Sequence, residues 1–395
     1  DQTSTHVTLY TPFPELTEMQ TVPLLMTVPN ANSGQTKPAA GWPVLIFGHA
    51  LTSNRSNALA VADTAAAAGY AVIAIDFPLH GITPEDAALA PLYVENTPFA
   101  PIANERTFDL DLVNNDTGAP GPDGKVDPSG THFFNLQSML TSRDNLRQGQ
   151  ADLFTLAANI PFISIDGDML PDLDGSTIAY AGLALGGIMG VPFVAVEPSV
   201  TSAFLSAPMG GIARGLEASE TIGPRIRAGL EAAGVEPGST DYELFFIMFQ
   251  TMLESGDPIN WAAEASMVND IVVHEVIGDT VIPNGVGISA PLSGTEPLIA
   301  AMGLTSYSST QQNSNGVDLA GRFVPPATHT SFLDPSTSPA ATAEMQKQLA
   351  SFLATRGKAV VVEDAGTMVP VPTPGAEEAA DAPQKTAPVI KKQPK

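Results

Sequence analysis

The chain has 395 residues, of which 44% are hydrophobic, so it is long enough to bury a large core in one or two domains. Its 17 basic and 42 acidic residues give a formal net charge of −25, which argues against nucleic acids and anionic membrane surfaces as partners. The absence of cysteine excludes disulfides, thiol catalysis and cysteine-ligated metals.

The predicted elements alternate between strands and helices, which favours a mostly parallel sheet. An apolar run at 43–47, an alanine-rich helix over 57–68 and a second apolar run at 71–76 form a β-α-β unit. An amphipathic helix is predicted over 340–355 and a short apolar run over 359–362. Between these units the sequence predicts further strands at 177–181, 201–206, 270–277 and 320–324.

Three longer insertions interrupt this alternation. The first, about 84–132, is rich in loops and in aspartate, and the third, 283–318, is rich in Ser, Gly and Asn. The second, about 210–265, contains a strongly apolar helix and is predicted to be a helical cap or lid. We expect one α/β domain over residues 1–362, followed by a disordered tail rich in Pro, Ala and Glu over 363–395.

Residues 177–190 predict a buried strand that turns sharply into a helix. The turn reads Gly182-Leu-Ala-Leu-Gly186, which is the G-x-S-x-G pattern of a hydrolase nucleophile elbow with Ala184 at the nucleophile position. Flanking glycines relieve crowding in such a turn. A methyl group cannot attack a carbonyl, so the covalent step is missing. The alternative interpretation, a glycine pattern that serves helix packing, is less favoured because a strand precedes the turn and a helix follows it.

An acid and a histidine follow in the order that α/β-hydrolases use, which is nucleophile, acid and base. Asp279 comes directly after the strand at 270–277, where its carboxylate could orient an imidazole. Asp257 is a rival acid, but it lies inside the second insertion and not at the end of a strand. Of the six histidines, His329 is the one that comes late enough in the chain to be the base.

Two backbone N–H groups are predicted to form an oxyanion hole. Leu185 supplies the first because it follows the nucleophile position. Leu51 supplies the second, because the loop His49-Ala50-Leu51 corresponds to the His-Gly-x loop of many esterases. His49 is then expected to shape this loop and not to act as the base.

The second insertion contains apolar side chains for which two interpretations stay open. They either pack onto the core or line a groove for an acyl chain. The candidates for substrate binding are Phe245, Phe246, Phe249 and Met252.

Carboxylates at alternate positions of one loop raise Ca²⁺ as a weak possibility. These are Asp166, Asp168, Asp172 and Asp174, and a looser acidic group occurs in the first insertion. Solvated turns are the simpler interpretation in so acidic a chain, and no other cofactor is expected.

Four segments together resemble a known family. They are 19–26, 140–148 with its Arg143-Asp-Asn-Leu-Arg147 motif, 172–175 and 182–188. The sequence resembles the secreted or surface-attached bacterial lipases and lysophospholipases called virulence-factor lipases, which belong to the α/β-hydrolase superfamily. The resemblance implies an α/β-hydrolase fold and a serine esterase that acts on acyl esters of lipids, with Asp279 as acid, His329 as base and Ala184 in place of the serine.

Two hypotheses account for the alanine. Either the serine of a lipase, esterase or lysophospholipase was replaced to give an inactive enzyme, or the chain is a natural pseudo-hydrolase that binds lipids or esters. The retained Asp279 and His329 favour replacement. No apolar stretch is long enough to span a bilayer. The resemblance implies a secreted or cell-surface bacterial protein, and because the chain starts Asp1-Gln2-Thr3 we expect that its leader has been removed.

Overall fold

The computed structural model describes residues 7–168 and 170–372. Within these residues the core is an eight-stranded sheet in the order β1-β3-β2-β4-β5-β6-β9-β7. In this sheet β1 runs antiparallel to β3, and every other pair of neighbouring strands runs parallel. The strands are β1 Leu24–Thr27, β2 Trp42–Gly48, β3 Ala71–Ile75, β4 Leu173–Leu183, β5 Val200–Ser206, β6 Asp270–Val276, β7 Thr305–Tyr307 and β9 Asp318–Phe323, with β8 Gln311–Gln312 and β10 Ala359–Val360 paired separately.

The central strands are apolar along most of their length because helices cover both faces of the sheet. Every residue of β2 and β3 is buried. The six predicted strands are confirmed as β2, β3, β4, β5, β6 and β9. The sequence missed β1 and β7, which are edge strands of four and three residues with partly exposed side chains.

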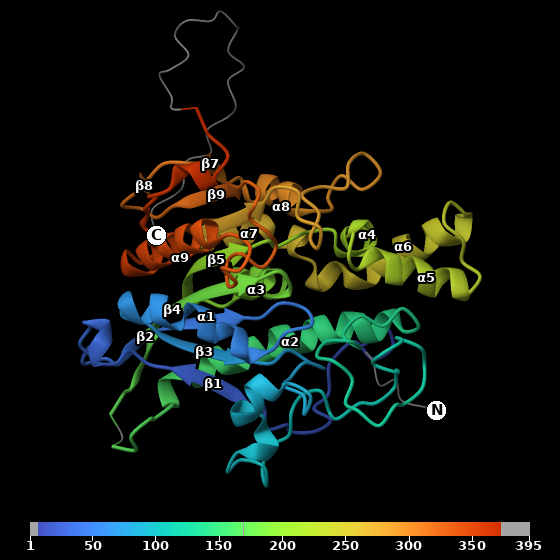
Figure 1. Cartoon of the computed structure of the whole chain (residues 1–395), viewed down its shortest axis with the longest axis horizontal. Helices are drawn as coiled ribbons and strands as arrows, with labels where there is room; N and C mark the ends of the chain where they lie inside the picture. Colours follow the sequence, from blue (N-terminus) through green and yellow to red (C-terminus); the bar gives the residue numbers. More distant parts are fainter. Residues whose placement is uncertain (1–6, 169, 373–395) are drawn as a thin grey trace, which may run out of the picture.

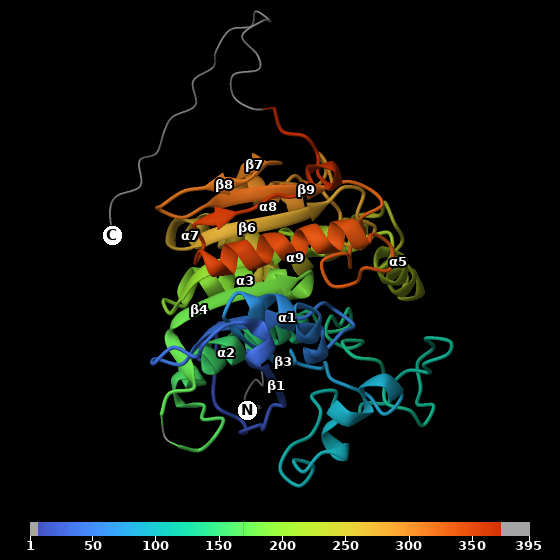
Figure 2. The same cartoon turned by 60° about the vertical axis from the view of Figure 1, so that its left-hand side comes forward.

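Nine α-helices flank or extend the sheet in the described part of the chain. They are α1 Leu59–Ala67, α2 Met139–Asn159, α3 Leu185–Val196, α4 Ile212–Ala218, α5 Gly223–Ala232, α6 Thr240–Leu253, α7 Ala262–Val268, α8 Thr295–Met302 and α9 Pro339–Ala354. Helix α1 contacts α9 on one face, while α2, α3, α7 and α8 contact one another in series on the other (Figures 1 and 2). This arrangement is the α/β-hydrolase fold, as the sequence predicted.

Each insertion follows the carboxyl end of a parallel strand, since the chain enters the first beyond β3, the second beyond β5 and the third beyond β6. The second extends from the end of the sheet where β5 leads into α4 (Figure 1). The second insertion forms α4, α5 and α6, and α6 contacts both α2 and α4. The first insertion consists of loops with two short 3-10 helices, Ala87–Leu92 and Val94–Asn96. The third contains α8, which the sequence did not predict. The carboxyl ends of the parallel strands therefore open toward these segments, where ligands bind in open α/β sheets.

The predicted tail is wrong for its first ten residues. Met368 is buried and forms an antiparallel bridge with Phe323, and the Val369 N–H donates to the Arg322 carbonyl over 2.8 Å. This pairing of the segment with β9 could not be predicted from the sequence, because backbone pairing needs no particular side-chain pattern. Residues 373–395, the rest of the predicted tail, lie outside the described residues. Across 7–168 and 170–372, no helix combines the length and apolar character that crossing a bilayer requires.

Candidate active site

Ala184 is the residue at which β4 gives way to α3, and its backbone adopts a strained conformation there. Its φ of 51° and ψ of −109° fall in a region that residues with a side chain rarely occupy. A Cβ on Gly186 would lie 2.0 Å from the Gly48 carbonyl oxygen, and one on Gly182 would lie 2.5 Å from the Gly186 carbonyl carbon. The buried Tyr180 hydroxyl donates to the Gly186 carbonyl over 2.6 Å. The glycines thus permit the sharp strand-to-helix turn that the sequence indicated.

The structure brings Asp279 and His329 together at the ends of β6 and β9. The Nδ1 of His329 lies 2.7 Å from Oδ2 of Asp279. The other carboxylate oxygen accepts the N–H groups of Val281 and Ile282, over 2.8 and 3.1 Å. An ionised carboxylate only accepts hydrogen bonds, so Nδ1 carries a proton and the lone pair of a neutral ring lies on Nε2. This is the tautomer that a general base requires.

Asn284 braces the loop that carries Asp279. Its side-chain oxygen accepts the Gly278 N–H over 2.8 Å, and its Nδ2 donates to the Val276 carbonyl, also over 2.8 Å. Its own carbonyl accepts the N–H of Glu296 at the start of α8. One side chain therefore ties the end of β6 to the acid loop. This role could not be predicted from the sequence, since Asn after Pro283 is typical of any turn.

The loop of His329 is anchored by Phe332, whose side chain is fully buried. The Phe332 ring stacks at 5.7 Å from Phe204 of β5 and at 6.5 Å from Phe47 of β2. The Ser331 hydroxyl oxygen accepts the Thr328 N–H over 2.9 Å. His329 is thus held on the sheet through its neighbours and not only through Asp279.

The two predicted oxyanion donors come from neighbouring strand ends. Leu185 is the first residue of α3, where a helix N–H has no partner within the helix. Leu51 lies in the turn after β2, in which the Ser53 N–H donates to the Ala50 carbonyl and Thr52 has a φ of 63°. Strands β2 and β4 pair in register with Gly48 opposite Gly182, so the two loops start side by side.

His49 is a structural residue of the Leu51 loop, in agreement with the expectation from sequence. Its Nε2 accepts the Phe77 N–H over 3.0 Å, and its Nδ1 donates to the Ala50 carbonyl over 2.9 Å. Burial lowers the pKa of His49 to about 4 and that of His80 to about 3. Both rings are therefore neutral at pH 7, and both nitrogens of His49 serve the backbone.

Asp257, the rival acid, has a different role. Its fully buried carboxylate accepts the N–H groups of Gly211, Ile212 and Ile259 and the side-chain amide of Gln250. These bonds hold the start of α4 to the end of α6. The ring of His329 contacts Asp279 instead.

The other histidines are also placed. His274 is buried in β6 and bonds to Tyr307 and Gln348, and His132 lies in a loop against Asp127. His6 lies outside the described residues.

The apolar candidates on α6 do not form one surface. Phe246 and Phe249 are fully buried, and the Arg214 guanidinium lies 4.5 Å above the Phe246 ring. Phe245 and Met252 are half-buried. The burial of Phe246 and Phe249 matches the interpretation in which these side chains pack onto the core and do not line a groove for an acyl chain. The apolar side chains that α6 exposes are others: Leu244, Ile247 and Met248.

The four carboxylates considered for Ca²⁺ are used as local hydrogen-bond acceptors. Asp172 binds Lys37 Nζ over 2.8 Å and accepts the Ile165 N–H, while Asp168 and Asp174 accept backbone N–H groups two residues further along. Asp166 accepts the Asp168 N–H. Within residues 7–168 and 170–372, no three His, Asp or Glu side chains gather in a way that could hold a metal ion. The contacts therefore give the calcium interpretation no support.

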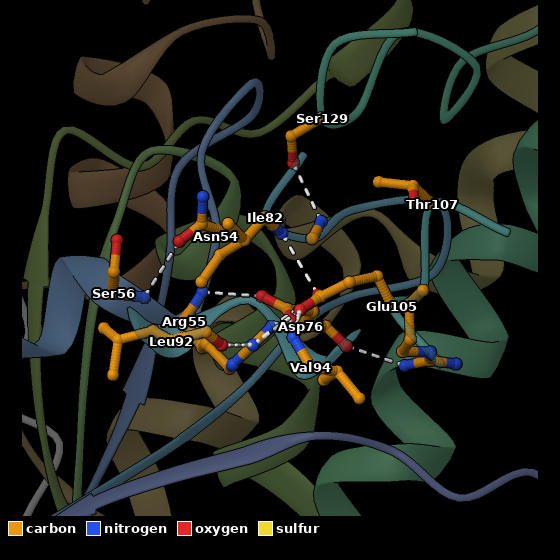
Figure 3. Close-up of polar contacts among 12 residues, drawn as sticks. Asn54, Arg55, Ser56, Asp76, Ile82, Leu92, Val94, Glu105, Thr107 and Ser129 are labelled. Atoms are coloured by element: carbon orange, nitrogen blue, oxygen red, sulfur yellow. Dashed lines mark hydrogen bonds and ion pairs between the residues drawn. The ribbon is translucent and has the colours of Figure 1, made fainter. Parts of the chain in front are cut away.

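A buried charge network that the sequence did not reveal joins the first insertion to the core (Figure 3). The Arg55 guanidinium binds both oxygens of Glu105, over 2.7 and 2.8 Å, and also contacts Asp76. The Arg55 N–H donates to Asp76 over 2.6 Å. Glu105 further accepts the N–H groups of Ile82 and Val94. The network fixes the first insertion to the chain just beyond the Leu51 loop.

No protein-family model matches the sequence, and no curated protein does. Several solved structures are similar in fold. An acetyl xylan esterase from Paenibacillus sp. R4 is 14% identical, with a TM-score of 0.43 over 78% of this chain and 73% of that one. A monoacylglycerol lipase from Paleococcus ferrophilus is 12% identical, with a TM-score of 0.43 over 85% and 99%. A thermophilic esterase from Thermogutta terrifontis is 11% identical, with a TM-score of 0.46 over 85% and 89%. Two of these three neighbours are esterases and one is a lipase.

Proposed function

We propose that the chain is the scaffold of a carboxylic-ester hydrolase of the Ser-His-Asp type, with Ala184 at the position of the nucleophile. The observation that carries the proposal is the 2.7 Å contact between His329 Nδ1 and Asp279 Oδ2, which leaves Nε2 as the base. The strained turn at Ala184 supports it, since backbone strain of this kind occurs at functional sites.

With a serine at position 184 the reaction follows from these groups. The hydroxyl oxygen attacks the ester carbonyl, and its proton passes to Nε2 of His329, whose positive charge Asp279 then stabilises. The N–H groups of Leu51 and Leu185 hold the oxyanion. Collapse of the intermediate releases the alcohol, which takes the proton from His329. Water then attacks the acyl group by the same route and frees the acid.

In the chain as it stands, the acyl-enzyme cannot form. Removal of the nucleophile leaves oxyanion stabilisation and binding, so hydrolysis by this polypeptide is very slow or absent. We infer that it is an inactivated member of the virulence-factor lipase type, whose active members the resemblance implies to cleave acyl esters outside the cytoplasm. The intact acid–base pair supports this, because a chain that only binds has no chemical need for it.

The second candidate function is binding of esters or lipids without cleavage. The observation that favours it is the alanine itself, which keeps the shape of the turn and removes the reactive atom. Under this hypothesis Asp279 and His329 serve only to hold the two loops together.

Restoration of the hydroxyl by Ala184→Ser separates the two functions. Turnover of p-nitrophenyl esters of graded chain length is measured for the parent, for Ala184→Ser and for Ala184→Ser with His329→Gln. We expect turnover in Ala184→Ser and its loss in the double variant, which retains the serine without the base. An Ala184→Ser protein that is folded and shows neither a burst nor turnover would refute the hydrolase proposal.

A further inference from the structure

Two carboxyl groups meet at a single nitrogen near the loop of Asp279. The Nε of Arg322, on β9, lies 2.6 Å from Oε1 of Glu296 and 3.1 Å from Oε2 of Glu275. Glu275 is the residue of β6 that lies opposite Arg322, and Glu296 belongs to the first turn of α8. The two carboxyl groups are therefore close enough to influence each other's ionisation.

The two carboxyl groups differ in their hydrogen bonds. Glu296 is half-exposed, and the Arg322 guanidinium donates to both of its oxygens, over 2.6 and 2.7 Å. Glu275 is fully buried, and within residues 7–168 and 170–372 neither of its oxygens accepts a hydrogen bond. A buried carboxylate without a donor is costly, whereas a protonated carboxyl group can itself donate. Glu275 therefore holds a proton, which it donates to Glu296.

The surroundings of Glu275 favour this proton. On the side of β6 away from β9, the register places the apolar Ala207 beside Glu275, so the charged groups that face it are Glu296 and Arg322. Burial and the carboxylate of Glu296 raise the pKa of Glu275 to about 8, and the Arg322 guanidinium lowers the pKa of Glu296. With one proton on the acidic pair, the three side chains together carry no net charge.

Asn284 connects this acidic pair to the acid loop. Its backbone carbonyl accepts the Glu296 N–H over 2.8 Å. Its side chain forms hydrogen bonds with two backbone groups of the segment between Glu275 and Asp279. The pair is thus joined to the acid loop from both sides, through the chain that follows Glu275 and through the start of α8. A change in the separation of the two carboxyl groups is therefore transmitted to the carboxylate that orients the base.

We propose that Glu275 and Glu296 share a proton that keeps the acid loop in place, which makes Glu275 a positioning residue for Asp279 and His329. Loss of the proton leaves two negative charges against one arginine, and the carboxylates repel each other. Glu296, the half-exposed partner, then moves toward solvent and draws Asn284 with it. The role in catalysis rests on the proposed ester hydrolysis, while the coupling between the pair and the loop does not.

The coupling is tested on the parent chain, where no turnover is needed. The isoleucine δ1 methyl groups are isotopically labelled, and their NMR signals are followed from pH 6 to pH 9.5. Ile282 reports on the acid loop, because its side chain is buried and its N–H donates to Asp279. Ile46, buried in β2, is the internal control. We expect the Ile282 signal to shift with an inflection near pH 8 and the Ile46 signal to stay constant.

Variants show which group titrates. Glu275→Gln keeps the side-chain size and a hydrogen to donate but has no proton to lose, so the Ile282 inflection should disappear. Glu296→Gln removes the neighbouring negative charge and leaves Arg322 to Glu275, so the inflection should move down by at least about one pH unit. Glu264→Gln, at an exposed site of α7, is the matched control. Either pair variant decides the question if the other folds poorly. An inflection that is absent from the parent, or unchanged in either pair variant, would overturn the proposal.

The role in catalysis is tested in the Ala184→Ser protein with a p-nitrophenyl ester, after correction for spontaneous hydrolysis. We expect kcat to fall about tenfold between pH 7 and pH 9.5 with little change in KM, because a displaced catalytic group slows the chemical step. Ala184→Ser combined with Glu275→Gln should lose less than about twofold. An equal fall in both proteins, or a fall that accompanies loss of the near-UV circular dichroism signal, would overturn the role. Absence of turnover at every pH would instead refute the proposed hydrolysis and leave the methyl titration standing.

Discussion

Gly186→Ala tests the close approach of α3 to β2 on which the turn at Ala184 depends. The added Cβ would lie 2.0 Å from the Gly48 carbonyl oxygen, whereas ordinary contact starts at 3.4 Å, so the two backbones must separate by about 1.4 Å. Separation would also break the 2.6 Å bond from Tyr180 to Gly186. The lost bond and the overpacking together cost about 3–5 kcal/mol.

Helix propensity acts in the opposite direction, since alanine stabilises a helix by about 1 kcal/mol relative to glycine. The expected net loss in the free energy of unfolding is therefore about 2–4 kcal/mol, measured by urea denaturation with tryptophan fluorescence. Gly285→Ala is the matched control, because its Cβ meets nothing within 4 Å, and it should change stability by less than about 0.5 kcal/mol. A Gly186→Ala variant as stable as this control would refute the reasoning.

Three further predictions concern the acid, a buried carboxyl and an anchor. In the Ala184→Ser background, Asp279→Asn should lower kcat about 10⁴-fold by favouring the wrong tautomer of His329, and an unchanged kcat would contradict the role of the acid. Burial raises the pKa of Glu275 to about 8 from 4.5, so the folded state retains a proton that the unfolded state loses and stability falls as pH rises between these values. Glu275→Gln should therefore reduce the drop in Tm between pH 5 and pH 9, and a drop equal to the parent's would argue against it. Phe332→Ala should cost about 3–5 kcal/mol in urea denaturation, and a loss below 1 kcal/mol would show that Phe332 does not anchor the loop.

Much of the fold follows from patterns within single segments. The runs at β2 and β3 are apolar throughout because the strands are buried on both faces, and such runs are visible without any tertiary information. The edge strands β1 and β7 lack such an apolar run, because their side chains are partly exposed to solvent. Residues 363–372 are held by backbone bonds to β9 and Val324, and by the Glu344 carboxylate, which accepts the N–H groups of Glu363 and Asp364. No local pattern encodes these contacts.

In the candidate site, too, some residues could be predicted from the sequence and others could not. Chain order and strand ends were enough to select Asp279 and His329, because parallel strands bring their carboxyl ends to one edge. The supporting residues were not predictable. Asn284 acts through backbone groups on both sides of it, and Arg55 reaches Glu105 across 50 residues of chain, so neither forms a motif. For Phe246 and Phe249, hydrophobicity predicts burial but not what covers the rings.

The central claim is that position 184 is the place of the nucleophile, and covalent labelling tests it most directly. A fluorophosphonate probe is incubated with the parent, with Ala184→Ser and with Ala184→Ser combined with His329→Gln, and the adduct is located by peptide mass spectrometry. We predict one adduct, at position 184, in Ala184→Ser alone. Labelling of the parent to the same extent, or an adduct at any other residue of Ala184→Ser in its place, would contradict the account.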